Sequence, residues 1–281
     1  MTGRSLGATE SRPVIALAGV SVHRRTTGQE IVLDSVDWTV RTGEHWALLG
    51  PNGAGKTTML RLAGALLHPT AGTVDVLGHR LGRVDVRELR ARLGLVTAAQ
   101  KVPLDATAHT VVLTGVTGTV QPLWRMYDAD DRERAHDLLV ELGCKELAGR
   151  AFGDCSGGQR ARVLIARALM SEPSLLLLDE PFNALGLPSR EDLVDALHRL
   201  ADGRPGLSTV TVTHHPEELP PSTSHAYLLK EGRELVSGPV DSVLTSENFT
   251  RCFGRPIRVE AHDGRWYARS ASLPGPERPG V

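Results

Sequence analysis

A glycine-rich segment at residues 50–58, GPNGAGKTT, fits the pattern G-x-x-x-x-G-K-[ST]. Glycines at this spacing let the backbone wrap round phosphate oxygens with its N–H groups pointing inward. Lys56 is placed to neutralise β- and γ-phosphates, and the Thr57 hydroxyl suits Mg²⁺. The alternative is a glycine turn before an ordinary helix, but the segment lies between a strand-like and a helix-like run, as a phosphate loop requires. The predicted nucleotide contacts are Gly50, Pro51, Asn52, Gly53, Ala54, Gly55, Lys56, Thr57 and Thr58.

Two adjacent carboxylates, Asp179 and Glu180, follow four leucines in the segment SLLLLDEP at 174–181. A carboxylate at the end of a buried strand can hold Mg²⁺ through water, and the next one can polarise a water for in-line attack on a γ-phosphate. Capping of the next turn is the alternative, and the phosphate loop elsewhere in the chain makes it the weaker one. The pair is therefore predicted to act on Mg²⁺ and on the attacking water.

Strand-like and helix-like segments alternate around these groups. Short apolar or β-branched runs at 45–50, 92–98, 174–179 and 209–213 are typical of central strands in a sheet covered on both faces. A helical pattern runs from Lys56 to about Leu67 and stops before Pro69. This order predicts an α/β fold in which the phosphate loop joins a strand to a helix.

The rest of the chain is organised differently. Residues from about 101 to 170 are mostly helical in pattern and have no clear strand, which predicts an inserted helical subdomain. Near the end, Asp263-Gly264 separates two extended runs within 257–269 and predicts a β-hairpin. Residues 1–12 and 271–281 are rich in Gly, Pro and Ser, so both tails are expected to be disordered.

Composition excludes several classes of function. The formal net charge of −1 and the 4% aromatic content leave neither a basic field nor stacking platforms for nucleic acid, so no nucleic-acid partner is expected. Three cysteines without a CxxC pair favour reduced thiols in the cytoplasm over disulfides or zinc. The N-terminus does not resemble a signal peptide, and the longest uncharged run, 106–124, is too polar to span a bilayer. Any membrane role is therefore expected to come through a partner.

A third motif, CSGGQRARVLIARALMSEP at 155–173, precedes the acidic strand by a short distance. Ser156 and the N–H groups of the next residues open a helix and can bind a γ-phosphate. A capped amphipathic helix is the alternative, but it does not explain two glycines in the first turn. This segment resembles the signature of ATP-binding cassette (ABC) ATPases, and the resemblance covers about residues 13–248. It implies that Ser156, Gly157, Gly158 and Gln159 contact the ATP of an opposing subunit.

The resemblance also implies the remaining site residues and the fold. Gln100 matches the Q-loop glutamine that senses Mg²⁺ and the membrane partner, and His214 matches the switch histidine that contacts the γ-phosphate. Together with the motifs above, it implies catalytic Glu180, His214 and Lys56, metal-binding Thr57, Gln100 and Asp179, and the cofactors ATP and Mg²⁺. The implied fold is a P-loop NTPase (RecA-like) core with an N-terminal antiparallel β subdomain and an inserted α-helical subdomain.

Three positions depart from the family's pattern. Residues 20–25, VSVHRR, lack the aromatic that stacks on adenine, and Arg24 or His23 is the expected substitute. Cys155 replaces the usual leucine before the signature serine. Gly186 replaces the aspartate of the D-loop, which bridges the two subunits. We therefore expect slow basal ATP hydrolysis and a short-lived dimer rather than loss of the chemistry.

The function that the resemblance implies is an ATP-hydrolysing subunit that powers an ABC transporter through ATP-dependent head-to-tail dimerisation. Its expected partners are transmembrane permease subunits on separate chains and a second ATPase subunit, in a homodimer or heterodimer. The chain would then be cytoplasmic and peripheral to the cell membrane. The ABC ATPase domain is assigned to 13–248, and residues 249–270 to a C-terminal extension.

Two alternatives to this function remain. The first is a soluble single-cassette ABC ATPase with a regulatory or repair role, although one cassette without a heptad run favours transport. The second is an inactive nucleotide-binding scaffold, which suits Gly186 but not the intact Lys56, Asp179, Glu180 and His214.

Overall fold

The computed structural model describes residues 12–25, 29–97 and 100–271. The two tails predicted to be disordered lie outside the described residues, apart from Arg12 and Ala271. In the described part of the chain, no helix is long and apolar enough to cross a membrane. All three cysteines are buried as free thiols.

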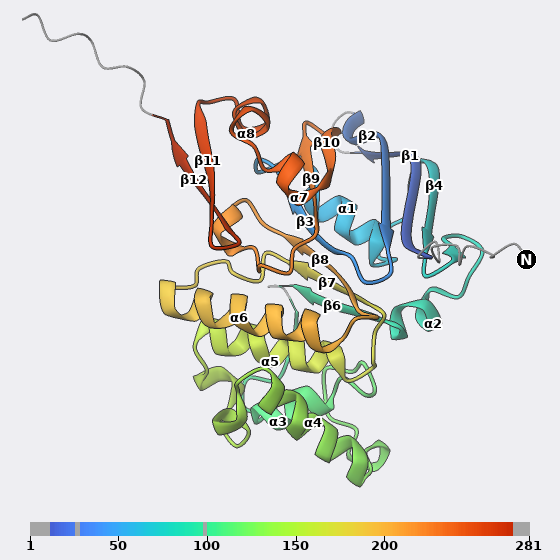
Figure 1. The fold of residues 1–281 in the computed structure, drawn as a ribbon. Helices are drawn as coiled ribbons and strands as arrows, with labels where there is room; N and C mark the ends of the chain where they lie inside the picture. The colour runs from blue at the N-terminus through green and yellow to red at the C-terminus, as the bar shows by residue number, and fades with distance from the viewer. Residues whose placement is uncertain (1–11, 26–28, 98–99, 272–281) are drawn as a thin grey trace, which may run out of the picture.

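A six-stranded sheet forms the centre of the molecule (Figure 1), in the order β10-β9-β3-β8-β7-β6. Strands β9, β3, β8, β7 and β6 pair in parallel, and β10 pairs antiparallel with β9. The strands are β3 (His45–Leu49), β6 (Leu93–Thr97), β7 (Leu175–Asp179), β8 (Ser208–Val212), β9 (His225–Lys230) and β10 (Arg233–Pro239).

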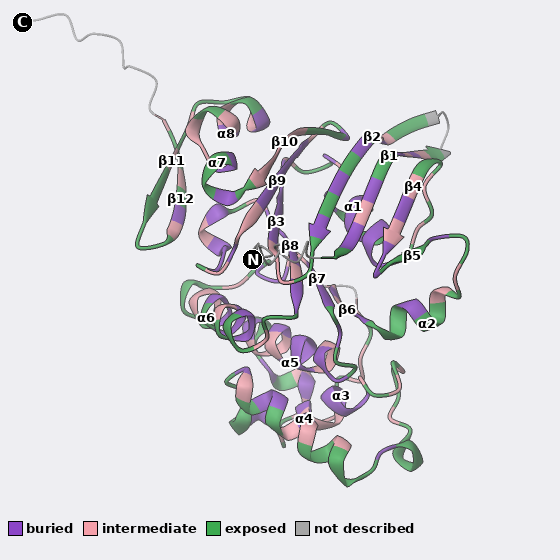
Figure 2. Ribbon diagram, turned by 45° about the vertical axis from the view of Figure 1, so that its right-hand side comes forward, coloured by how far each residue is buried: buried purple, intermediate pink, exposed green. Residues whose placement is uncertain are grey.

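Both faces of this sheet are covered, which explains its apolar strands. The four leucines of β7 are all fully buried, and they alternate between two hydrophobic cores. Leu175 and Leu177 pack in the core that includes helix α1 (Lys56–Ala63), whereas Leu176 and Leu178 pack in the core of α5 (Gly157–Leu169) and α6 (Leu187–Gly203). Figure 2 shows the resulting band of buried residues along the central strands.

A second sheet, entirely antiparallel, has the order β2-β1-β4-β5 and packs over α1. Its strands are β1 (Pro13–Arg25), β2 (Gln29–Arg41), β4 (Ala71–Val76) and β5 (His79–Arg80). Helix α1 ends at Ala63 rather than near Leu67, because Gly64 caps it and Ala65 adopts a positive φ of 53°. The helical pattern beyond Ala63 therefore overestimates the length of this helix.

Helices make up most of the segment from 101 to 170, and the described residues there form no strand, only an isolated bridge between Thr107 and Ala151. Besides α5, the segment contains α3 (Ala108–Leu113), η1 (Trp124–Met126), α4 (Ala129–Glu141), η2 (Lys145–Leu147) and η3 (Phe152–Asp154). A short helix, α2 (Val86–Ala91), precedes β6. The helical segment shares one core with α6 and one face of the central sheet.

The C-terminal elements form a third core against β9 and β3. They are η4 (Pro216–Glu218), α7 (Val240–Val243), α8 (Ser246–Phe253), β11 (Ile257–His262) and β12 (Arg265–Ser270). Strands β11 and β12 form an antiparallel hairpin. Its turn residues Asp263 and Gly264 both have positive φ, 49° and 73°, as a tight two-residue hairpin requires.

Candidate active site

The phosphate loop joins β3 to α1, and its backbone requires glycine. Gly50, Gly53 and Gly55 have φ values of 152°, 79° and 106°. A Cβ added to Gly50 would lie 2.1 Å from the carbonyl oxygen of Leu229, and one added to Gly55 would lie 2.9 Å from that of Val32. The loop therefore packs directly on neighbouring backbone and presents its other side at the N-terminus of α1, where N–H groups favour an anion.

Lys56 is the first residue of α1, and its side chain folds back over the loop. Its Nζ donates to the carbonyl oxygens of Gly50, at 2.7 Å, and Pro51, at 3.0 Å. The residue is only 5% exposed. Burial lowers the pKa of Lys56, while the charges of Glu180 and Asp179 oppose that shift. The ammonium group is therefore held against the loop carbonyls, where the charges of the acidic pair act on it.

Thr57 and Asp179, which are 122 residues apart in the sequence, meet at this point. The Thr57 hydroxyl donates to Oδ1 of Asp179 at 3.4 Å. Burial raises the pKa of Asp179, the neighbouring Glu180 raises it further, and the Thr57 hydrogen bond and Lys56 lower it. The contact arises because Asp179 ends β7 where α1 packs against that strand.

The residues present here fit Mg²⁺. A hydroxyl and a carboxylate supply oxygen donors, and Gln100 lines the same cavity of about 730 Å³ as Asp179. Oε1 of Gln100 is buried and has no hydrogen-bond partner among the described residues. No group of three or more His, Cys, Asp or Glu side chains in that part of the chain could hold a metal alone. Mg²⁺ suits such a site because it takes most of its ligands from phosphate and water.

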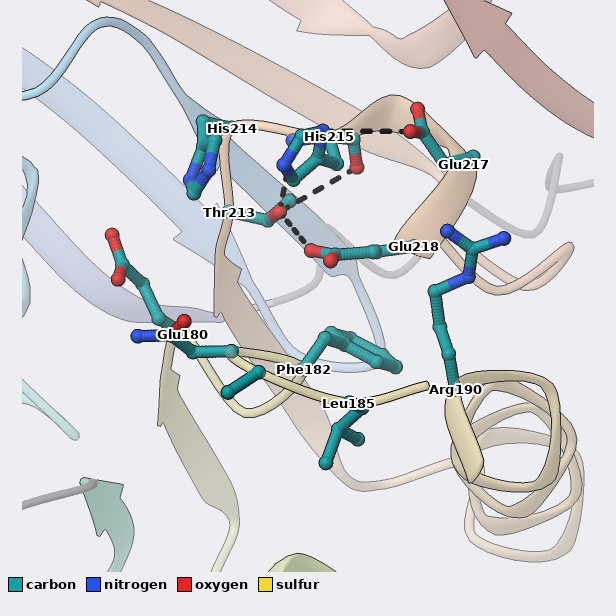
Figure 3. A pocket seen from close by; sticks show the side chains of 11 residues that line it. Glu180, Phe182, Leu185, Arg190, Thr213, His214, His215, Glu217 and Glu218 are labelled. Atoms are coloured by element: carbon teal, nitrogen blue, oxygen red, sulfur yellow. Dashed lines mark hydrogen bonds and ion pairs between the residues drawn. The ribbon is translucent and has the colours of Figure 1, made fainter. Parts of the chain in front are cut away.

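Glu180 and His214 line a second pocket, of about 200 Å³, together with Asn183 and Glu218 (Figure 3). Glu180 has a φ of 50°, held by its backbone N–H, which donates to the carbonyl of Val212 at 3.1 Å. A non-glycine residue in this conformation costs about 1–3 kcal/mol and is found at active sites. The preceding residue, Asp179, is the last residue of β7, and Glu180 lines both this pocket and the larger cavity of Asp179 and Gln100.

The loop that carries His214 is closed by its own hydrogen bonds. The N–H of His215 donates to Oγ1 of Thr213 at 3.0 Å, the Thr213 hydroxyl donates to the Glu218 carboxylate, and the Glu218 N–H donates to the His215 carbonyl at 3.2 Å. The His214 and His215 rings lie 4.1 Å apart, and Nδ1 of His214 has no partner within the described chain. Backbone placement and this ring contact therefore fix His214.

Ser156 caps α5 through a complete capping box with Gln159. Its Oγ accepts from the Gln159 N–H at 3.3 Å, and its own N–H donates to Oε1 of Gln159 at 2.9 Å. A Cβ on Gly158 would lie 2.7 Å from Cβ of Ser189 in α6, and one on Gly157 would lie 3.1 Å from Leu185. Packing of α5 on α6 thus accounts for Gly158 without any ligand, so this glycine is weaker support for phosphate binding than the sequence pattern implies.

Arg24, the expected partner of adenine, lies near the exposed end of β1. Its Nη1 is 3.8 Å from Oε2 of Glu30 on the paired strand β2. The residues between these strands, 26–28, lie outside the described part of the chain. A role of Arg24 or His23 in stacking on the base remains a prediction.

Sequence reasoning missed Glu218 and Arg265. Glu218 is 9% exposed, and burial raises its pKa. Arg265 contacts both Glu191 and Glu217 from the C-terminal hairpin. Neither residue belongs to a short motif, so no local signal in the sequence marks them.

Comparisons with known proteins agree with this arrangement. The family described as ABC transporter matches residues 33–183. An uncharacterized ABC transporter ATP-binding protein, YlmA, of Bacillus subtilis is 39% identical over 88% of this chain and 93% of its own length. The hemin import ATP-binding protein HmuV of Nocardia farcinica is 35% identical over 92% of this chain and 90% of its own.

Solved structures show the same cassette fold. A putative metal-chelate type ABC transporter in an inward-facing conformation superposes with a TM-score of 0.75 at 25% identity, over 94% of this chain and 99% of that one. A dimeric ATP-binding cassette in a post-hydrolysis state, bound to ADP and Pi, gives 0.70 at 27% identity, over 80% and 98%. These likenesses confirm the predicted P-loop core with its antiparallel β subdomain. The chain belongs to the ABC transporter family, as one of its ATP-binding proteins.

Proposed function

We propose that this chain binds and hydrolyses Mg·ATP in a head-to-tail dimer and thereby powers transport through permease subunits on separate chains. The contact between Thr57 and Asp179, next to Lys56, carries the proposal. It unites hydroxyl, carboxylate and ammonium from distant segments in the arrangement that phosphoryl transfer needs. The names of the relatives, which include an import and a transport ATP-binding protein, favour transport over a regulatory or repair role.

Each residue of the site has a distinct part in the reaction. Lys56 neutralises the terminal phosphates, and the loop N–H groups hold them in place. Bound by Thr57, Asp179 and Gln100, Mg²⁺ would neutralise charge on the β- and γ-phosphate oxygens. Glu180 accepts the proton of the attacking water, and His214, in the same pocket, donates to the γ-phosphate.

The partners follow from two features. The dimeric cassette bound to ADP and Pi supports a pair of head-to-tail chains, with the signature at Ser156 facing the other chain's ATP. Exposed apolar residues in the helical segment support a protein partner there: Leu104, Trp124 and Met126 are 60%, 54% and 64% exposed. We assign this surface to the permease, which would place the chain at the cytoplasmic side of the membrane.

Ser156→Arg tests the composite site. A long cation at the exposed start of α5 should prevent the approach of a second chain, so turnover should fall about 100-fold or more, with the Kd for ATP of a single chain unchanged. Steady-state hydrolysis and calorimetry measure the two quantities. Asp128→Arg is the matched control, because it removes the same kind of capping box from α4. Normal turnover in Ser156→Arg, or equal losses in both variants, would count against a role for the signature.

Gly186→Asp tests the departure in the D-loop. Gly186 has a φ of −69°, forms the N-cap of α6 without a side-chain hydrogen bond, and has no atom within 4 Å of an added Cβ. Aspartate therefore fits without strain. Restoring the carboxylate should lengthen the lifetime of an ATP-bound Glu180→Gln dimer, measured by dilution. Gly186→Ser caps α6 but lacks the charge. Equal lifetimes for the Asp and Ser variants would show that the glycine is neutral.

A further inference from the structure

The C-terminal hairpin reaches the active site through one arginine. Trp266, 6% exposed, anchors β12 in the C-terminal core. Because successive strand residues point to opposite faces, the preceding Arg265 points away from that core. Its side chain is 14% exposed. Figure 1 shows the hairpin turn directed towards α6 and the segment after β8.

The guanidinium of Arg265 joins two segments of the active site. Nη1 donates to Oε2 of Glu191 at 2.9 Å, and Nη2 donates to the backbone carbonyl of Glu217 at 2.6 Å. Glu191 lies in the second turn of α6, the helix that begins directly after Gly186. Glu217 lies three residues after His214. One side chain therefore connects the D-loop side of the site to the loop of the switch histidine.

A second arginine holds the Glu191 end of this connection. Arg190 also contacts Glu191, with Nε 3.3 Å from Oε1, and the hydrogen bond from Arg265 lowers the pKa of Glu191. Nε of Arg265 is buried without a partner in the described chain. A charged donor so removed from water strengthens the hydrogen bonds that it does make. Although the Glu191 side chain is 40% exposed, the largely buried guanidinium makes this link stronger than an ion pair between two exposed side chains.

The loop that carries His214 connects the contact at Glu217 to the position of the His214 side chain. Its internal hydrogen bonds, among Thr213, His215 and Glu218, make residues 213–218 one unit (Figure 3). The carbonyl of Glu217 belongs to that unit, so the hydrogen bond from Arg265 to this carbonyl restrains the whole unit. His214 depends on it, because its own Nδ1 has no hydrogen-bond partner in the part of the chain that is described.

We propose that Arg265 is a positioning residue for ATP hydrolysis, which sets His214 relative to the segment that runs from Glu180 to Glu191. The inference rests on the proposed ATPase function. The C-terminal hairpin then contributes a residue that positions the active site. In this chain, which lacks the D-loop aspartate, Arg265 connects α6, the helix after Gly186, to the loop of His214 within one subunit.

The test compares Arg265→Ala with Arg269→Ala, which removes an exposed arginine that pairs with Glu260 inside the same hairpin. Arg265→Ala should lower kcat by about 10- to 100-fold, the cost of misplacing a reacting group by about 1 Å. The Kd for ATP, measured in a Glu180→Gln background, should stay within about twofold, because the phosphate loop is untouched. Arg269→Ala should change neither quantity. A folded Arg265→Ala chain with the wild-type kcat overturns the proposal.

A second comparison separates positioning from a general structural role. In a His214→Ala background, Arg265→Ala should cause no further loss of kcat, because its effect passes through His214; an undiminished loss there overturns the proposal. Arg265→Lys keeps one hydrogen bond and should therefore retain part of the kcat that Arg265→Ala loses. If Arg265→Ala does not fold, Arg265→Lys replaces it in both comparisons, and a wild-type kcat in Arg265→Lys would then overturn the proposal. A wild-type chain that hydrolyses no ATP would instead overturn the proposed function itself.

Discussion

Lys56→Ala is expected to abolish tight binding of Mg·ATP. The ammonium of Lys56 lies against the loop carbonyls of Gly50 and Pro51, beside the acidic pair, where it can neutralise the terminal phosphates. Alanine leaves the loop N–H groups in place but removes this charge from a buried position, where it cannot be replaced by water. Kd should rise about 100-fold or more, which corresponds to about 2.8 kcal/mol. Isothermal titration calorimetry with Mg·ATP measures the change.

Lys230→Ala is the matched control for that measurement. Lys230 lies beside the phosphate loop, in a cavity with Asn52 and Gly53, but its Nζ donates to the carbonyl of Arg251 at 2.6 Å. Its loss should leave the affinity close to the wild-type value. Near-wild-type affinity in a folded Lys56→Ala chain would show that the loop does not bind the terminal phosphates.

Glu180→Gln is expected to stop turnover while leaving ATP bound. Glutamine keeps the shape and hydrogen-bonding atoms of glutamate but cannot take a proton from water, so kcat should fall about 100-fold or more. The groups proposed to hold Mg·ATP, which are Lys56, Thr57 and the loop, do not change. An ATP-bound dimer should therefore accumulate. Single-turnover hydrolysis measures the rate of the chemical step directly.

Glu217→Gln controls for loss of a negative charge in the same pocket. Its side chain lines the pocket shared by Glu180 and His214, and its Oε1 lies 3.4 Å from Nδ1 of His215, a contact that glutamine can keep as a hydrogen bond. The contact to Arg265 is made by the backbone carbonyl of Glu217, which remains. Turnover should change little. If Glu180→Gln hydrolyses ATP at the wild-type rate, another group activates the water and the assignment of the base is wrong.

Local motifs explain why the core of the site could be predicted from the sequence. The glycines of the phosphate loop adopt positive φ in a short segment, and the acidic pair ends a continuous run of buried leucines. The same is true of the Asp263-Gly264 turn, whose residues both adopt positive φ. Each signal lies within a few residues, where backbone geometry and residue type are directly linked.

Tertiary contacts explain what could not be predicted. Arg265 meets Glu191 across 74 residues and Glu217 across 48, and an arginine in an extended run carries no sign of either partner. The close approach of Gly158 to Ser189 likewise depends on how α5 packs on α6. Such contacts are set by the whole fold and not by a local pattern.

Sedimentation equilibrium of the Glu180→Gln chain tests the composite site most directly. With Mg·ATP, a site shared between two phosphate loops and two signatures predicts a species of two chains that holds two ATP molecules, and chains without ATP should remain single. Adding Ser156→Arg should return the species to single chains that each still bind one ATP. Dimers that persist with Ser156→Arg, or single chains at every concentration with ATP bound, would contradict a site completed by the second chain.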